Sequence, residues 1–189
     1  MIQTTFTVRE LDTPVGRLAL IGSTDGIRAI LWPGDAPSRA GLTDATFDIG
    51  TTVALDDAAE QLDEYFAGTR TTFDLPLDLR GTPFQIAAWE ALATIPYGAT
   101  HTYAEQAARI GRPNAVRAIG AANGRNPISI VLPCHRVVGS DGSLTGFAGG
   151  LEAKAALLAF EAARVSVSTR TPPGANNQGG TGPAPTDRA

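Results

Sequence analysis

The stretch "THTYAEQAARIGRPNAVRAIGAANGRNP", residues 100–127, gives the clearest indication of the fold. Its first half predicts a short helix that ends at Gly111, because glycine favours the backbone conformation found just after helices. Its alanine-rich second half predicts another helix, which ends at the turn-forming "GRNP". Two short helices joined by "IGRPN" are typical of a helix-turn-helix.

The sequence on both sides of this pair is also helical. In "TPFQIAAWEALATIPYG", residues 82–98, Thr82 suits the N-cap and Pro83 the first helical position. "LEAKAALLAFEAAR", residues 151–164, predicts a strong closing helix. We therefore expect a mainly helical domain over residues 80–165. Residues 166–189 are rich in Pro, Gly, Ser, Thr and Asn, a composition that predicts a disordered tail.

The first 79 residues predict a different kind of domain. "FTVRELDTPVGRLALIGSTDGIRAILW", residues 6–32, alternates apolar and polar positions between turn signals, which favours a small antiparallel sheet. Residues 35–52 have the composition of a loop. Residues 54–68 predict a helix that stops at Gly68, and residues 69–81 an edge strand or extended linker. Together the two domains, 1–79 and 80–165, give an α+β protein.

The charges are distributed unevenly between these domains. The chain of 189 residues has a net charge of −4, with 43% hydrophobic and 18% charged residues, which is ordinary for a soluble globular protein. Residues 1–79 hold 5 Arg against 13 Asp and Glu, whereas residues 80–165 hold 8 Lys and Arg against 5 Asp and Glu. This asymmetry indicates that the second domain meets a polyanion.

A cytoplasmic location without membrane contact is expected. The chain begins without a charged-then-apolar leader, and no apolar run reaches the ~18 residues of a membrane span. The single cysteine also suits a reducing compartment.

"ISIVLPCHRVVGSDG", residues 128–142, contains that cysteine, Cys134. One cysteine excludes an internal disulfide, and with two histidines it cannot build a common structural zinc site, so we expect neither metal nor cofactor. A thiol needs a base to become a nucleophile, and His135 is a candidate. Neighbouring side chains of an extended segment point to opposite faces, so the two would communicate through a bend or a bridging water. Glu161, on the helix face of Leu157, is the candidate for orienting the imidazole.

Each of these residues taken alone also has an ordinary structural explanation. A lone cysteine is most often a buried small hydrophobe, and a neighbouring histidine can simply satisfy a local carbonyl. The combination is more specific. "PCHRVVGSDGSLTGFAGGLEAK" together with "NGRNPISIVLPCHRV" closely resembles the signature of the O6-alkylguanine-DNA alkyltransferases. The likeness covers about residues 80–161, and residues 1–79 resemble the family's variable N-terminal domain loosely. It implies a ribonuclease H-like first domain and a winged-helix-like second domain.

The resemblance also implies chemical roles. Cys134 resembles the acceptor that takes the alkyl group irreversibly, and His135 the base that acts through a water to hold the thiol as thiolate. Glu161 matches the acid that orients the imidazole. Asn126 matches the residue that braces the turn before the active-site strand, and Tyr103 the hydroxyl that helps guanine leave.

Further residues are implied to contact the DNA or the extruded base. Arg117 matches the arginine that replaces the flipped nucleotide in the base stack, and a flat cation is suited to that place. The expected DNA contacts are Arg117, Ala118, Gly120 and Tyr103. The expected guanine pocket is lined by Cys134, Val137, Phe147, Ala148 and Trp89. Phe147 stands where family members often carry tyrosine, so a hydrogen bond near the pocket is in doubt.

The implied function is DNA repair by direct reversal. O6-alkylguanine in double-stranded DNA would be flipped out, at a cost of a few kcal/mol, and its alkyl group transferred once to Cys134. O4-alkylthymine as a second substrate stays open, as does cooperative assembly of an otherwise monomeric protein on DNA. Three alternatives are a non-catalytic alkyltransferase-like protein that binds lesions, a cysteine hydrolase and a plain helix-turn-helix regulator.

Overall fold

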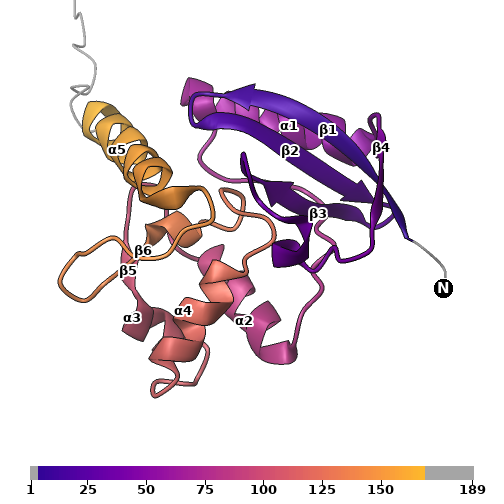
Figure 1. Ribbon diagram of the computed structural model, residues 1–189. Coiled ribbons are helices and arrows are strands. Elements are labelled where there is room, and N and C mark those ends of the chain that lie inside the picture. Colours follow the sequence, from indigo (N-terminus) through magenta and orange to yellow (C-terminus); the bar gives the residue numbers. More distant parts are fainter. Residues whose placement is uncertain (1–3, 169–189) are drawn as a thin grey trace, which may run out of the picture.

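The computed structural model describes residues 4–168 of the chain (Figure 1). The N-terminal part, up to residue 79, is built on a four-stranded sheet with the order β3-β2-β1-β4. Its strands are β1 (Thr5–Thr13), β2 (Gly16–Ser23), β3 (Gly26–Leu31) and β4 (Thr46–Ile49). β1, β2 and β3 pair antiparallel through tight turns, as the alternating sequence predicts.

The expectation of a loop over residues 35–52 is wrong. This segment contains a 3₁₀ turn, η1 (Pro37–Ala40), and the short strand β4, which pairs parallel with β1. Its apolar side chains join a small core cluster with residues of the sheet, and Phe47 packs 6.4 Å from Phe6 between ring centroids. A four-residue strand held by tertiary pairing leaves little periodicity to detect.

Helix α1 (Val53–Ala67) covers one face of the sheet. Thr52 caps its start by accepting a hydrogen bond from the Leu55 amide, and Gly68 ends it in the left-handed conformation. Residues 69–81 then form the expected extended linker, in which residues 76–78 pair with the outer edge of β3. The Ile27 amide donates to the Pro76 carbonyl at 2.8 Å, and the Asp78 amide donates to the Ile27 carbonyl at 2.9 Å.

The C-terminal part is mainly helical, which confirms the α+β class. Helix α2 (Pro83–Leu92) begins with the Thr82 cap, and the Gln85 side chain completes a capping box. The predicted helix-turn-helix is formed by α3 (Tyr103–Arg109) and α4 (Val116–Gly124), with Gly111 left-handed between them. Both helices pack on α2 through small side chains, and a buried pair of amides, Gln106 and Asn123, joins them to each other.

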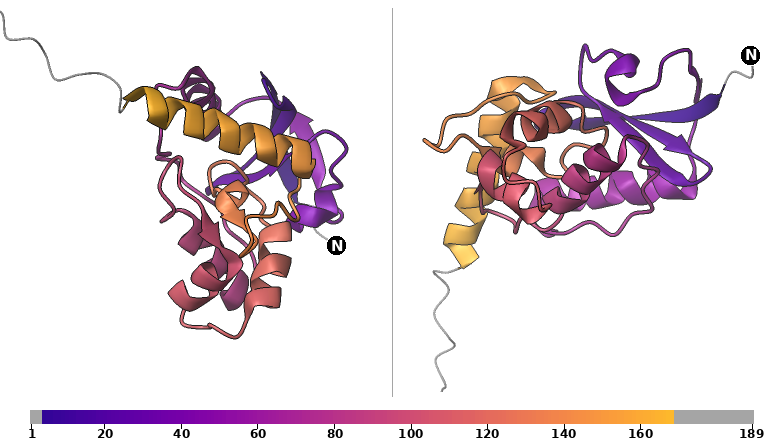
Figure 2. Two further views of the ribbon diagram at one scale, coloured as in Figure 1. Left: turned by 90° about the vertical axis from the view of Figure 1, so that its left-hand side faces the viewer. Right: turned by 90° about the horizontal axis from the view of Figure 1, so that it is seen from below.

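The chain closes with the segment that holds the cysteine and a long helix. A 3₁₀ turn, η2 (Cys134–Arg136), leads into β6 (Val137–Val138), which pairs parallel with β5 (His101–Thr102). Helix α5 (Gly150–Ser168) crosses over η2, opposite the end that carries α3 and α4 (Figure 2). It continues three residues into the expected tail, and residues 169–189 lie outside the described part. No helix within residues 4–168 is long and apolar enough to cross a membrane.

The N-terminal part of the chain supports the turn that precedes the cysteine. The Ile30 amide of β3 donates to the Pro127 carbonyl at 2.8 Å. The Trp32 indole donates to the Ser129 hydroxyl at 2.8 Å, and Arg39 donates to the Asn126 carbonyl at 2.8 Å. One apolar core extends from the sheet to the cysteine. Both parts of the chain therefore fix the position of residues 126–134.

Candidate active site

Asn126 braces the turn that leads to the thiol. Its side-chain amide donates to the Leu132 carbonyl at 2.7 Å, and its side-chain oxygen accepts from the Ile128 amide at 3.1 Å. Between these two bonds the backbone of Ile130 takes a φ of +77°, which is unusual for a β-branched residue. The buried amide of Asn126 thus holds a strained turn in place, with Cys134 at its end.

The thiol and the imidazole occupy a tight turn rather than an extended segment. Cys134 and His135 are successive residues of η2, where side chains diverge by about a third of a turn. Cys134 is 4% exposed and His135 is fully buried. The segment is not extended here but bent, which is one of the two arrangements offered by the sequence analysis, because the Arg136 amide donates to the Pro133 carbonyl at 2.9 Å and closes the turn.

His135 and Glu161 form the predicted pair. The imidazole Nε2 lies 2.9 Å from Oε1 of Glu161, and both side chains are fully buried. No hydrogen-bond partner faces Nδ1 within residues 4–168. Because the carboxylate can only accept when ionised, Nε2 carries the proton and Nδ1 keeps a lone pair. The imidazole is therefore set up to accept a proton at Nδ1.

Arg136 compensates the buried charge of Glu161, a role that sequence reasoning left open. Its Nε and Nη2 each lie 2.9 Å from a different Glu161 oxygen, and its Nη1 donates to the Ile95 carbonyl at 2.7 Å. Burial would raise the pKa of Glu161, but the bonds from His135 and Arg136 outweigh it and lower that pKa to about 2. The carboxylate is ionised at any working pH.

Burial dominates the titration of the thiol and the imidazole. Burial raises the pKa of Cys134, although a hydrogen bond with Asn126 and the charge of Lys154 oppose it. Burial likewise lowers the pKa of His135 against the pull of Glu161. Burial therefore favours the neutral thiol and the neutral imidazole, and the thiolate expected from the action of His135 stays a prediction.

Lys154 is a second buried cation that sequence reasoning missed. Its Nζ donates to the Val137 carbonyl at 2.6 Å and to the Thr145 carbonyl at 2.8 Å. It thereby fastens the loop after β6 to α5. Burial lowers its pKa, and the neighbouring Cys134 opposes that shift. A usable signal was present, since Lys154 shares the face of α5 on which Leu157 and Glu161 lie.

Tyr103 borders a pocket next to helix α4, whereas Phe147 packs on His135 and does not line that pocket. The Tyr103 hydroxyl donates to the Thr145 carbonyl at 3.2 Å, and a pocket of about 320 Å³ opens beside it. The Phe147 ring packs edge-on against the His135 imidazole, 6.3 Å between centroids. Tyr103, Val116, Gly120, Thr145 and Gly146 line the pocket. Of the other expected pocket residues, Val137 is buried and Ala148 half-buried.

Helix α4 presents the expected DNA-contacting residues next to that pocket. Arg117 and Ala118 are exposed, and Gly120 faces Tyr103 with room for a Cβ, which would lie 4.0 Å from the ring. No hydrogen bond or ion pair holds Arg117 within the described part of the chain. Its guanidinium is therefore free to engage a ligand.

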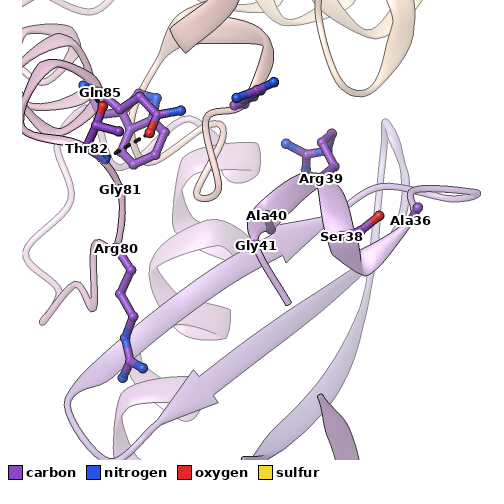
Figure 3. A pocket seen from close by; sticks show the side chains of 11 residues that line it. Ala36, Ser38, Arg39, Ala40, Gly41, Arg80, Gly81, Thr82 and Gln85 are labelled. Carbon is purple, nitrogen blue, oxygen red and sulfur yellow. Dashed lines mark hydrogen bonds between the residues drawn. The ribbon is translucent and has the colours of Figure 1, made fainter. Parts of the chain in front are cut away.

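Trp89 is a core residue that lines a pocket other than the one beside Tyr103. Its indole donates to the Ala122 carbonyl at 2.8 Å, which fastens α2 to α4. It lines a separate pocket of about 620 Å³ between α2 and η1, where Arg39 and Arg80 also lie (Figure 3). Its ring is buried in the core, and its expected place in the guanine pocket stays a prediction.

The chain matches two family profiles. Residues 83–163 match the family described as 6-O-methylguanine DNA methyltransferase, DNA binding domain. Residues 5–79 match the family described as 6-O-methylguanine DNA methyltransferase, ribonuclease-like domain.

Several curated proteins and solved structures are similar over most of the chain. The methylated-DNA–protein-cysteine methyltransferase of Mycobacterium tuberculosis is 49% identical over 158 residues, which are 82% of this chain and 92% of that protein. The constitutive enzyme of the same name from Bacillus subtilis is 45% identical over 151 residues, 79% of this chain and 92% of that protein. The crystal structure of Mycobacterium tuberculosis OGT in complex with DNA has a TM-score of 0.74 and 46% identity, and covers 85% of this chain and 94% of that one.

Proposed function

Since the chain belongs to the 6-O-methylguanine DNA methyltransferase family, we propose that Cys134 is the residue that takes the alkyl group from damaged DNA. The protein is a DNA-repair enzyme of the methylated-DNA–protein-cysteine methyltransferase class, and it acts by direct reversal. The observation that supports the role of Cys134 most directly is the buried His135–Glu161 pair in the adjacent turn, at 2.9 Å. A cysteine that served only as a small hydrophobe would not need it.

The substrate is O6-alkylguanine in double-stranded DNA. Cys134 is 4% exposed and belongs to the apolar core, so a base stacked in a duplex cannot reach it. The damaged nucleotide must leave the stack, which costs a few kcal/mol. Arg117, exposed and without a partner among residues 4–168, takes its place, while Ala118 and Gly120 allow α4 to approach the minor groove closely.

The reaction transfers one alkyl group and one proton. The Cys134 thiol gives its proton to Nδ1 of His135 by way of a bridging water, and Glu161 stabilises the resulting imidazolium. The sulfur attacks the alkyl carbon, a C–S bond forms, and the C–O6 bond breaks with its electron pair on guanine. The Tyr103 hydroxyl donates to the leaving base, and the proton released by the thiol balances the one that guanine gains. The thioether persists, so each molecule acts once.

The cellular setting follows from the same chemistry. A thiol that must stay reduced until it is used fits the cytoplasm. We expect the protein to act as a monomer with residues 1–79 and 80–165 as its two domains. Cooperative assembly on DNA and transfer from O4-alkylthymine would be additions to this function.

Intact mass measurement tests the proposal. After incubation with a duplex that carries O6-methylguanine, the protein should gain the mass of one methylene group, once per molecule, on the peptide that contains Cys134. Cys134→Ala should gain nothing. Binding without any mass gain would favour a non-catalytic lesion-binding protein, and repeated turnover with release of product would favour a hydrolase.

A further inference from the structure

Helix α1 of the N-terminal part contributes a side chain to the buried proton relay. Tyr65 is fully buried, and its hydroxyl donates to Oε1 of Glu161 at 2.8 Å, across 96 positions in the sequence. Its ring packs among four other aromatic rings, those of Phe66, Phe73, Tyr97 and Phe160. The hydroxyl is therefore held in place by packing that does not depend on the hydrogen bond.

The oxygen that Tyr65 contacts is the one that serves His135. Oε1 of Glu161 accepts from Tyr65 at 2.8 Å, lies 2.9 Å from His135 Nε2, and accepts from Arg136 Nη2 at 2.9 Å. Oε2 is occupied by Arg136 Nε and the Gly98 amide, each at 2.9 Å. Each extra donor on Oε1 withdraws charge from it, so the oxygen attracts the imidazole proton less strongly.

We propose that Tyr65 is a positioning residue for alkyl transfer, which shares Oε1 with His135 and so keeps the imidazole a neutral base, ready to accept the thiol proton. The inference rests on the proposed function of Cys134 and extends it to the N-terminal part of the chain. Burial, followed by the charge of Glu161, raises the pKa of Tyr65, so its hydroxyl remains a donor throughout the working range.

Several other titratable groups surround the pair and must stay constant in any test. They come from the segment after α2, from η2 and from α5: Tyr97, Cys134, Arg136, Lys154 and Arg164. Tyr97 offers a matched control. Its ring lies 5.9 Å from that of Tyr65, but its hydroxyl has no hydrogen-bond partner within residues 4–168.

The experiment compares wild type, Tyr65→Phe and Tyr97→Phe by NMR titration of the imidazole ring protons. The chain has only two histidines, so His101 is an internal reference for His135. In Tyr65→Phe the protonation of His135 should move to higher pH by about one unit, because Oε1 then holds more charge. His101 should not move, and Tyr97→Phe should leave both histidines as in wild type.

The rate of reaction with the free base O6-benzylguanine, measured against pH, provides the second readout. In Tyr65→Phe the acid limb of the pH–rate profile should move to higher pH by the same amount as the His135 titration. The rate on the plateau should stay within about threefold of wild type. Circular dichroism at each pH confirms that every variant is folded. An unshifted His135 titration, or a uniform loss of rate at every pH, would overturn the role of Tyr65. If wild type itself failed to become alkylated, the function of Cys134 would be refuted, whereas the NMR result would stand.

Discussion

Glu161 is the residue on which both stability and chemistry converge. Its carboxylate is fully buried and accepts hydrogen bonds from Tyr65, Gly98 and Arg136 besides its pairing with His135. A buried charge with this many partners is expensive to expose and equally expensive to remove, because its cationic neighbour would then be left alone.

Glu161→Gln should therefore weaken both properties. We expect alkyl transfer to slow by roughly a hundredfold, since the imidazolium loses its counter-charge. The free energy of unfolding should fall by about 3–5 kcal/mol, because Arg136 stays buried without a carboxylate. Single-turnover kinetics and urea titration measure the two effects. The matched control is Glu152→Gln, an exposed position of the same helix, and an equal loss in both variants would contradict this role.

The sequence predicted some of these side chains and not others, for a physical reason. Cys134, His135 and Glu161 stand out because a thiol, an imidazole and a carboxylate on an apolar helix face form a recognisable chemical set. Tyr65 does not, since a tyrosine in an amphipathic helix is common everywhere. Lys154 gives a weaker signal, because it shares the helix face of Leu157 and Glu161 but a lysine near a helix start is usually exposed. Their roles arise from partners 96 and 17 positions away, which only the fold brings together.

The β2–β3 turn requires glycine for two separate reasons. Gly26 has a φ of +139°, and a Cβ added there would lie 2.3 Å from the Pro76 carbonyl oxygen. The linker passes close to this backbone because it pairs with the edge of β3. The turn thus connects the sheet to the segment that leads into α2.

Gly26→Ala should destabilise the protein more than a glycine replacement that strains φ alone. Gly34 has a φ of +80° with no atom within 4 Å of the added Cβ, so Gly34→Ala serves as the control. We expect Gly26→Ala to reduce the free energy of unfolding by roughly 1–3 kcal/mol more than the control does, because steric overlap adds to backbone strain. Urea titration of both variants gives the difference in the free energy of unfolding. An equal decrease in both would show that the linker moves away from the added Cβ at little cost.

Helix α4 should affect the repair of DNA without affecting the reactivity of the thiol. Arg117→Ala removes the guanidinium expected to fill the vacated base stack. We expect transfer from duplex O6-methylguanine to slow by about tenfold or more, and transfer from free O6-benzylguanine to stay the same, because a free base needs no flipping. Both rates can be followed by the appearance of alkylated protein. Equal losses on the two substrates would assign Arg117 to the fold or the pocket instead.

Elements whose signals are local could be predicted from the sequence, and β4 could not. Thr82, Pro83, Gly68 and Gly111 act within one turn of the residues they cap, so their meaning does not depend on distant contacts. β4 forms by pairing with β1, some 41 positions earlier. Its own short sequence, which contains Thr and Asp, does not indicate a strand. The turn at Cys134 is different, because a local bond from the Arg136 amide to the Pro133 carbonyl closes it, and the sequence analysis allowed a bend there without predicting a 3₁₀ turn.

The stability of the molecule should depend on pH through the buried relay. The pKa of Glu161 is lowered in the folded state to about 2, from 4.5 in the unfolded chain, so its contribution is complete above the unfolded value and is lost as the pH falls through that range. The pKa of His135 is also lowered, so protons favour the unfolded chain there too, from slightly acidic pH downward. Melting temperatures should therefore fall in two stages on acidification. Glu161→Gln should lose the lower stage, and an unchanged profile in that variant would contradict the assignment.

The hydrogen bonds from Ile30, Trp32 and Arg39 to residues 126–129 have a consequence for protein engineering. The two halves cannot be treated as interchangeable cassettes, although each matches a family profile of its own. A chimera with the first half of another protein would need residues equivalent to Trp32 and Arg39. Without them the turn before Cys134 would lose the hydrogen bonds to Ser129 and Asn126. Whether two halves from different proteins can be joined therefore depends on these contacts between the halves, and not only on the linker at residues 69–81.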